Sequence, residues 1–242
     1  MIQHLLLISH VSKHFGGNVA VSDVSFAVEE KQIFGLIGPN GAGKTTLFNC
    51  ITGFFPTTSG DVIFDNKKIN TLRPDEVCKL GMARTWQRVK PLGSLTVLEN
   101  VMVGAFSITN TTREAEIIAR EQLQMVGLSD YTTKSAGSLP IGLKKKLELA
   151  RVLATRPKML LLDEICGGLN HTETDIILNI IRNIRIKGAT IVFIEHDMKA
   201  VTSICDRIVV LNSGEKLAEG TPEEITNNSD VISAYLGGGH HA

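Results

Sequence analysis

The pattern of apolar and polar positions divides the chain into three parts. In the first and last parts, short apolar runs rich in β-branched residues predict buried strands. These strands lie at 5–11, 19–28, 32–37, 61–64, 159–162, 190–194 and 207–211. A turn is predicted at Asp65-Asn66 and another at 212–214, and a helix at 172–187 that ends at Gly188.

The middle part has the periodicity of helices. Thr111 and Glu114 stand in capping-box positions, and Gly127 is placed as a C-cap. Between them, the apolar residues on one helical face are Ala115, Ala119, Leu123 and Val126. This pattern predicts that 88–155 form a helical lobe, inserted into a chain that otherwise alternates strands with helices.

This order of elements predicts an α/β fold with a mainly parallel sheet and a ligand site at the carboxyl ends of its strands. We expect one domain over 1–242. Its core would lie at about 1–87 and 156–236, its helical lobe at about 88–155, and a flexible tail at 237–242. The two histidines of that tail are expected to belong to a disordered end or an added remnant.

Composition narrows the class of protein. Hydrophobic residues make up 43% of the 242 residues, which excludes a disordered chain. Lys plus Arg equals Asp plus Glu at 25 each, so no net basic field favours nucleic acid as a partner. The four cysteines lack C-x-x-C spacing and fit a reducing compartment, where we expect inert thiols. No run of about 18 apolar residues predicts a membrane span, and the start lacks the charged region of a signal peptide.

The strand predicted at 32–37 runs into a glycine-rich loop and then a helix that is expected to end at Gly53. The loop is Gly38-Pro39-Asn40-Gly41-Ala42-Gly43-Lys44-Thr45, with Thr46 next in the helix. Glycines at this spacing let backbone N–H groups surround nucleotide phosphates, and Lys44 adds a positive charge. The Thr45 hydroxyl is a ligand for Mg²⁺. The context predicts a site for ATP or GTP.

Acidic residues end two of the predicted strands. Asp163-Glu164 follows 159–162, and Glu195-His196-Asp197 follows 190–194. We expect Asp163 to act on Mg²⁺ and Glu164 to orient or deprotonate an attacking water. A histidine at the end of a strand is more often structural. Because Glu164 and the glycine-rich loop are predicted at the same site, His196 is a candidate partner of Glu164 and of a γ-phosphate. Gln87, a surface amide by composition, is a candidate link between the metal, the water and the helical lobe.

Together these motifs resemble the ATP-binding cassette of ABC transporters over nearly the whole chain. The matching stretches are 38–45, 85–87, 160–164, 168–170 and 195–197. Further stretches resemble the ATP-binding subunits of branched-chain amino acid importers, at 81–87, 95–101, 168–170 and 231–237. The resemblance implies a P-loop NTPase (RecA-like) core, an N-terminal antiparallel β subdomain and an inserted helical subdomain.

The resemblance also implies roles for single residues. Phe15 matches the aromatic that stacks on adenine, although a phenylalanine at a strand end is more often core packing. Gln87 matches the glutamine that joins the lobes, and Asn170 lies where the chain would cross to a second subunit. The segment 139–143 matches the signature that reaches the partner's ATP, here through Gly142.

That signature departs from the family pattern. Pro140 replaces the usual serine and Leu143 the usual glutamine, so a helix N-terminus near Gly142 is what remains to face phosphate. Ile165 replaces a proline after the acidic pair. For the following Lys144-Lys145-Lys146 we expect a solvated helix face rather than a phosphate or lipid contact.

The function implied is the Mg²⁺-dependent ATPase of an importer of branched-chain or related amino acids, peripheral on the cytoplasmic face of the inner membrane. Implied partners are a second ATPase subunit, identical or different, membrane permease subunits that dock near 88–92, and indirectly an extracytoplasmic solute-binding protein. The alternatives are the ATPase of a lipid or drug exporter and a regulatory ATPase outside transport.

Overall fold

A computed structural model describes residues 4–87 and 89–236. Its first sheet is antiparallel, in the order β2-β1-β4-β5. These strands are β1 (His4–Phe15), β2 (Asn18–Glu29), β4 (Ser59–Phe64) and β5 (Lys67–Lys68). The Asp65-Asn66 turn between β4 and β5 is confirmed, with both residues in the left-handed region at φ 48° and 61°. The tail 237–242 lies outside the described residues.

The second sheet carries the predicted nucleotide motifs, in the order β10-β9-β3-β8-β7-β6. Its strands are β3 (Ile33–Ile37), β6 (Met82–Arg84), β7 (Met159–Asp163), β8 (Thr190–Ile194), β9 (Arg207–Asn212) and β10 (Glu215–Gly220). All pairs are parallel except β9 with β10. Ile194 pairs with both Leu36 and Asp163, so β3, β7 and β8 end at one edge of the sheet. The predicted α/β class is confirmed.

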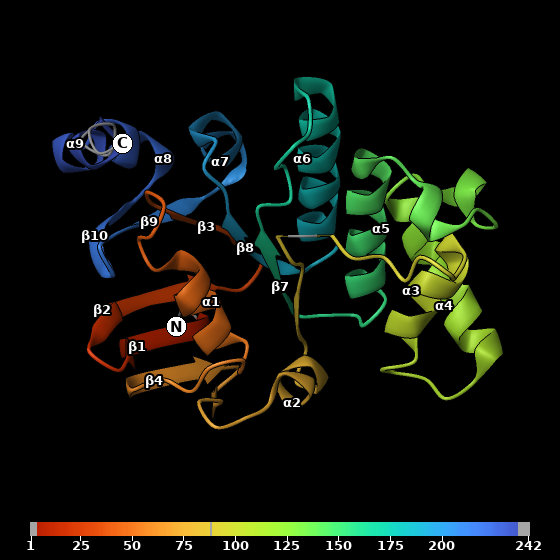
Figure 1. The fold of residues 1–242 in the computed structure, drawn as a ribbon, viewed down its shortest axis with the longest axis horizontal. Helices are drawn as coiled ribbons and strands as arrows, with labels where there is room; N and C mark the ends of the chain where they lie inside the picture. The colour runs from red at the N-terminus through yellow and green to blue at the C-terminus, as the bar shows by residue number, and fades with distance from the viewer. Residues whose placement is uncertain (1–3, 88, 237–242) are drawn as a thin grey trace.

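Helices cover the sheets and extend to one side. They are α1 (Lys44–Ile51), α2 (Pro74–Lys79), α3 (Val97–Ala105), α4 (Thr112–Met125), α5 (Ile141–Leu153), α6 (His171–Ile186), α7 (Met198–Ile204), α8 (Pro222–Thr226) and α9 (Ser229–Leu236). In Figure 1, α3, α4 and α5 gather beyond α6, at the end of the molecule away from α9. Among the described residues, no helix combines the length and apolar character that a membrane crossing requires.

Burial explains the apolar runs. β7 is buried along its whole length because Leu160 and Leu162 face the core of the helices, while Met159 and Leu161 face the core between the two sheets. Phe48 of α1 also lies in the second core, so that core holds α1 against both sheets.

The helix ends have the predicted capping residues, except that the capping box of α4 is incomplete. Gly53, Gly127 and Gly188 all have positive φ just after helices, as predicted. At α4, Thr111 accepts the Glu114 N–H, but the Glu114 carboxylate binds the Thr109 hydroxyl rather than closing the box. α6 begins at His171 behind a full capping box of Asn170 and Glu173, so Asn170 has a local structural role.

Candidate functional site

The glycine-rich loop joins β3 to α1 at the edge where the parallel strands end. Gly38 and Gly43 have φ of 148° and 95°, and a Cβ on either would collide with the carbonyl oxygen of Leu211 or Ala20. Only glycine fits both positions. Gly43 is the N-cap of α1 and supplies no side-chain cap, so the first N–H groups of the helix remain available to an anion.

Lys44 is 6% exposed, and its ammonium lies inside the loop. Nζ donates to the carbonyl oxygens of Gly38 at 2.6 Å and Pro39 at 2.9 Å. An ammonium has three donors, so one remains for a ligand. Burial lowers the pKa of Lys44, while the nearby charges of Glu164 and Asp163 raise it.

A cavity of about 580 Å³ opens over the loop. The loop residues 40–46 line it together with Gln87 and Glu164, as expected. Five further residues that the sequence did not assign to the site also line the cavity: Asn18, Val19, Ala20, Ser213 and Gly214. The turn at 212–214 was predicted, but nothing in its composition places it beside a ligand site.

Glu164 has a strained backbone. Its φ is 50°, which costs a non-glycine residue about 1–3 kcal/mol, and such strain is common at functional sites. Its side chain is 16% exposed, and two of the predicted site residues approach it. Gln87 donates from Nε2 to Oε2 at 2.6 Å, and His196 Nδ1 lies 3.4 Å from Oε1. Residues from three separate segments thus meet at one carboxylate.

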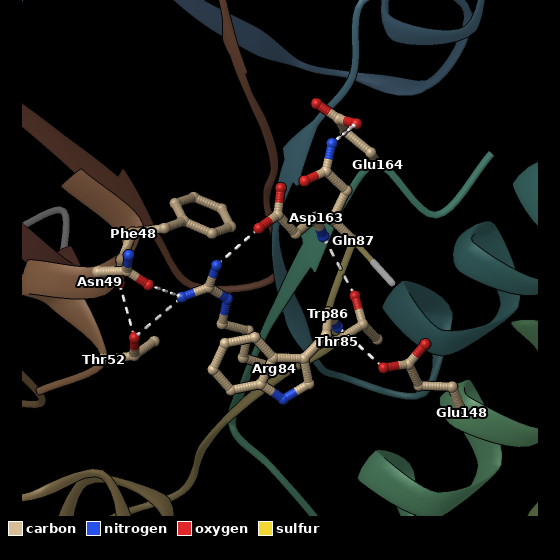
Figure 2. Close-up of polar contacts among 10 residues, drawn as sticks. All are labelled: Phe48, Asn49, Thr52, Arg84, Thr85, Trp86, Gln87, Glu148, Asp163 and Glu164. Carbon is tan, nitrogen blue, oxygen red and sulfur yellow. Dashed lines mark hydrogen bonds and ion pairs between the residues drawn. The ribbon is translucent and has the colours of Figure 1, made fainter. Parts of the chain in front are cut away.

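Asp163, 2% exposed, is paired with an arginine that sequence reasoning missed. Arg84 donates from Nη2 to Asp163 Oδ2 at 2.6 Å and from Nη1 to Asn49 Oδ1 at 2.6 Å. Figure 2 shows the Arg84 guanidinium between these two residues, with Phe48 and Trp86 beside it. The signal available in the sequence was the position of Arg84, three residues before Gln87; the strand that it ends, β6, was not predicted.

The two residues between Arg84 and Gln87 also bind residues around Asp163 and α5. The Thr85 hydroxyl accepts the Asp163 N–H at 3.1 Å. The Trp86 N–H donates to Oε1 of Glu148 on α5 at 2.9 Å. Four consecutive residues, 84–87, therefore connect Asp163 and Glu164 to α5 (Figure 2).

The expectation for 144–146 is wrong at Lys145. Lys144 and Lys146 are half-exposed, but Lys145 is 3% exposed and donates to the Glu164 carbonyl oxygen at 2.8 Å. Three consecutive residues of a helix point in different directions, so a run of lysines does not show which of them is buried. In α5, Lys145 is the one that points toward Glu164.

Two predicted ligand residues lie apart from the lining of the large cavity. Phe15, at the end of β1, is 43% exposed and packs edge-to-face on Phe55, so core packing is excluded. Gly142 lies near the start of α5 and lines a separate hollow with Pro140, where an added Cβ would lie 2.7 Å from Glu173 Oε1. The predicted start of the helix is confirmed, with α5 beginning at Ile141.

Comparison with known proteins gives consistent matches. Residues 21–167 match the ABC transporter family, and 215–241 match the branched-chain amino acid ATP-binding cassette transporter family. The high-affinity branched-chain amino acid transport ATP-binding protein BraF of Pseudomonas aeruginosa is 43% identical, over 98% of this chain and 99% of its own. The protein LivG of Escherichia coli, with the same description, is 41% identical with the same coverage.

Solved structures agree with these matches. An ATP-binding cassette from an ABC transporter, in its ADP conformation, has a TM-score of 0.89 at 31% identity, covering 97% of this chain and 99% of its own. A dimeric cassette bound to ADP and Pi, in a post-hydrolysis state, has a TM-score of 0.81 at 27% identity, covering 90% and 98%.

Proposed function

Because this chain belongs to the ABC transporter family of ATP-binding cassettes, we propose that it powers an importer of branched-chain or related amino acids by hydrolysing ATP. Relatives that match it from end to end, at 41–43% identity, bear that function in their names. The observation that carries the proposal is the meeting of Gln87 and His196 at the Glu164 carboxylate, beside the glycine-rich loop.

ATP would bind with its phosphates on the N–H groups of 38–46 and with the third Lys44 proton on the terminal phosphates. Phe15 would offer its exposed ring to adenine. Val19 lines the cavity and would contact the same end of the nucleotide.

The oxygen donors around the cavity fit Mg²⁺, which prefers such ligands and keeps several waters. The Thr45 hydroxyl, the Gln87 side-chain oxygen and Asp163 would hold it. Arg84 binds Oδ2 of Asp163, so Oδ1 would be the oxygen available toward Mg²⁺. When bound, Mg²⁺ would neutralise charge between the phosphates.

Glu164 would act as the base that polarises the attacking water. Gln87 donates to one oxygen of this carboxylate, and His196 lies 3.4 Å from the other. His196 and Lys44 would stabilise the charge on the transferred phosphoryl group.

A second ATPase subunit, identical or different, would complete the site. The N-terminus of α5 at Gly142 would face the partner's ATP and Asn170 would lie near the crossing. The solved dimeric cassette supports pairing of this kind. The grouping of α3, α4 and α5 supports our division of one domain into a core, at 1–87 and 156–236, and a helical lobe at 88–155.

Permease subunits would dock at the cleft beside Gln87, and the protein would act as a peripheral subunit on the cytoplasmic face of the membrane. A cavity of about 470 Å³ lies there, lined by Thr45, Asn49, Arg84, Trp86, Gln87, Lys90, Glu148 and Arg151. Of the expected docking segment, Arg88 lies outside the described residues. The solute-binding protein would act only through the permease.

The test is purification from membranes with identification of the companion chains, followed by ATPase assays of the reconstituted complex. We expect companion permeases and a solute-binding protein, with ATPase activity stimulated by leucine-like amino acids. Companions of an exporter, or ATPase activity that lipids or drugs stimulate and amino acids do not, would contradict the import function. A complex without any permease would contradict transport itself.

A further inference from the structure

α5 turns two ionisable side chains toward the segments that carry Glu164 and Gln87. Lys145 and Glu148 are three positions apart, which places them on one face of the helix, and they are 3% and 1% exposed. Lysine and glutamate are almost never fully buried unless they are paired or hydrogen-bonded. The hydrogen-bond partners of the two side chains show which segments they fix.

Lys145 holds the backbone of Glu164. Its Nζ donates to the Glu164 carbonyl oxygen at 2.8 Å, and the Gly167 N–H donates to the same oxygen at 3.1 Å. This peptide follows a residue in the left-handed region, at φ 50°, a conformation that persists only where its surroundings enforce it. A charged donor on the carbonyl fixes the peptide and, with it, the direction of the Glu164 side chain.

Glu148 holds the segment that carries Gln87. Its Oε1 accepts the Trp86 N–H at 2.9 Å, and the Trp86 ring packs edge-to-face on Phe54. The next residue, Gln87, donates to Glu164 Oε2 at 2.6 Å. Figure 2 shows the sequence of contacts from Glu148 through this segment to Glu164.

We propose that Lys145 and Glu148 are positioning residues for ATP hydrolysis, which together fix the Glu164 carboxylate from one helix. Lys145 acts through the Glu164 backbone, and Glu148 acts through Trp86 and Gln87. The inference rests on the proposed function of Glu164 as the base. It assigns α5 a role at the active site of its own chain, besides the role proposed for its N-terminus toward a partner.

The test uses two pairs of variants in the full chain. Lys145→Met removes the donor and keeps the apolar stem, whereas Lys145→Arg keeps a donor. Glu148→Leu removes the acceptor, whereas Glu148→Gln keeps an oxygen for the Trp86 N–H. Lys187→Met, at an exposed position at the end of α6, controls for the lost charge. For each variant, kcat, KM for MgATP, the melting temperature and amide hydrogen exchange at Trp86 are measured.

We expect kcat to fall about tenfold or more in Lys145→Met and Glu148→Leu while KM changes less than about threefold, because a small displacement of a base costs turnover rather than binding. Lys145→Arg and Glu148→Gln should retain most of kcat. Exchange at Trp86 should accelerate in Glu148→Leu and stay slow in Glu148→Gln.

Three results would overturn the inference. They are an unchanged kcat in Lys145→Met, equal kcat in Glu148→Leu and Glu148→Gln, and loss of activity only in proportion to unfolded protein. If Glu148→Leu fails to fold, the positioning role is still tested by comparing Lys145→Met with Lys145→Arg and by the exchange rate at Trp86 in Glu148→Gln. Glu164→Gln is assayed in parallel: if it retains normal turnover, the proposed base is wrong, whereas an inactive Glu164→Gln beside a fully active Lys145→Met removes only the positioning role.

Discussion

Arg84 and Asp163 form a buried ion pair, with 2.6 Å between Nη2 and Oδ2 and with 6% and 2% of the two side chains exposed. The pair joins β6 to β7 at the edge where the nucleotide cavity lies. Removing one partner of such a pair leaves an uncompensated buried charge, which is more costly than removing both.

Arg84→Met is therefore expected to lower the free energy of unfolding by about 3–5 kcal/mol. Adding Asp163→Asn should recover part of that loss without restoring ATPase activity, since the proposed metal ligand is then gone. Urea denaturation and phosphate release measure the two effects. If Arg84→Met is as stable as the parent protein, the pair contributes nothing to the fold.

Glu164→Gln should bind ATP normally and lose about a hundredfold or more of kcat, because the amide cannot accept the proton of the attacking water. Its shape is kept, and Gln87 and His196 remain in place. Phosphate release, nucleotide binding and size-exclusion chromatography with ATP are the measurements, the last to detect a trapped closed dimer. Undiminished phosphate release would remove Glu164 from the base role.

Lys44→Ala should weaken ATP binding by about ten- to a hundredfold, the value of one hydrogen bond to a charged group. The variant also loses the bonds to the Gly38 and Pro39 carbonyls, which hold the loop in shape. Calorimetric titration with ATP measures the affinity. The exposed Lys187→Ala is the matched control, and equal affinity in the two variants would contradict the assignment of the loop.

The cysteines should be unreactive in the folded protein. Burial raises the pKa of Cys50 to about 11, so about one molecule in a thousand carries its thiolate at pH 8. Burial raises the pKa of Cys78, Cys166 and Cys205 as well. Ellman's reagent should react slowly with the native protein. In guanidinium chloride, which unfolds the protein, it should react with all four thiols. Rapid native labelling would show that one of the four is accessible as thiolate.

Glu195 should make stability depend on pH. It is 1% exposed, its Oε1 accepts the Cys166 N–H at 2.7 Å, and burial raises its pKa above the usual 4.5. A carboxyl whose pKa is raised on folding stabilises the protein fully below its unfolded pKa. That contribution is lost as the pH rises through the folded pKa.

Glu195→Gln keeps an acceptor for the Cys166 N–H and removes the charge. The variant should gain stability relative to the parent as the pH rises from about 5 to 8. Thermal denaturation across that range measures the difference, and a difference that does not change with pH would contradict the expected penalty on the ionised form.

The sequence by itself determined the motifs whose geometry is local and several of the elements, although β6, β10, α2 and α7 were not predicted from it. The glycine-rich loop needs only a strand before it and a helix after it, and both are read from apolar spacing. The acids at 163–164 and the histidine at 196 follow strands that end at one edge, because parallel strands of one sheet place their carboxyl ends together.

Only the tertiary structure decided which partners the buried charges have. Arg84 and Asp163 are 79 positions apart, and Trp86 and Glu148 are 62 apart, so no local pattern indicates either contact. Lys145 was expected in solvent because a run of lysines favours an exposed face, and the position of α5 beside Glu164 reversed that expectation. Backbone geometry within a motif is set by nearby residues, whereas the partner of a buried side chain is set by how distant elements pack.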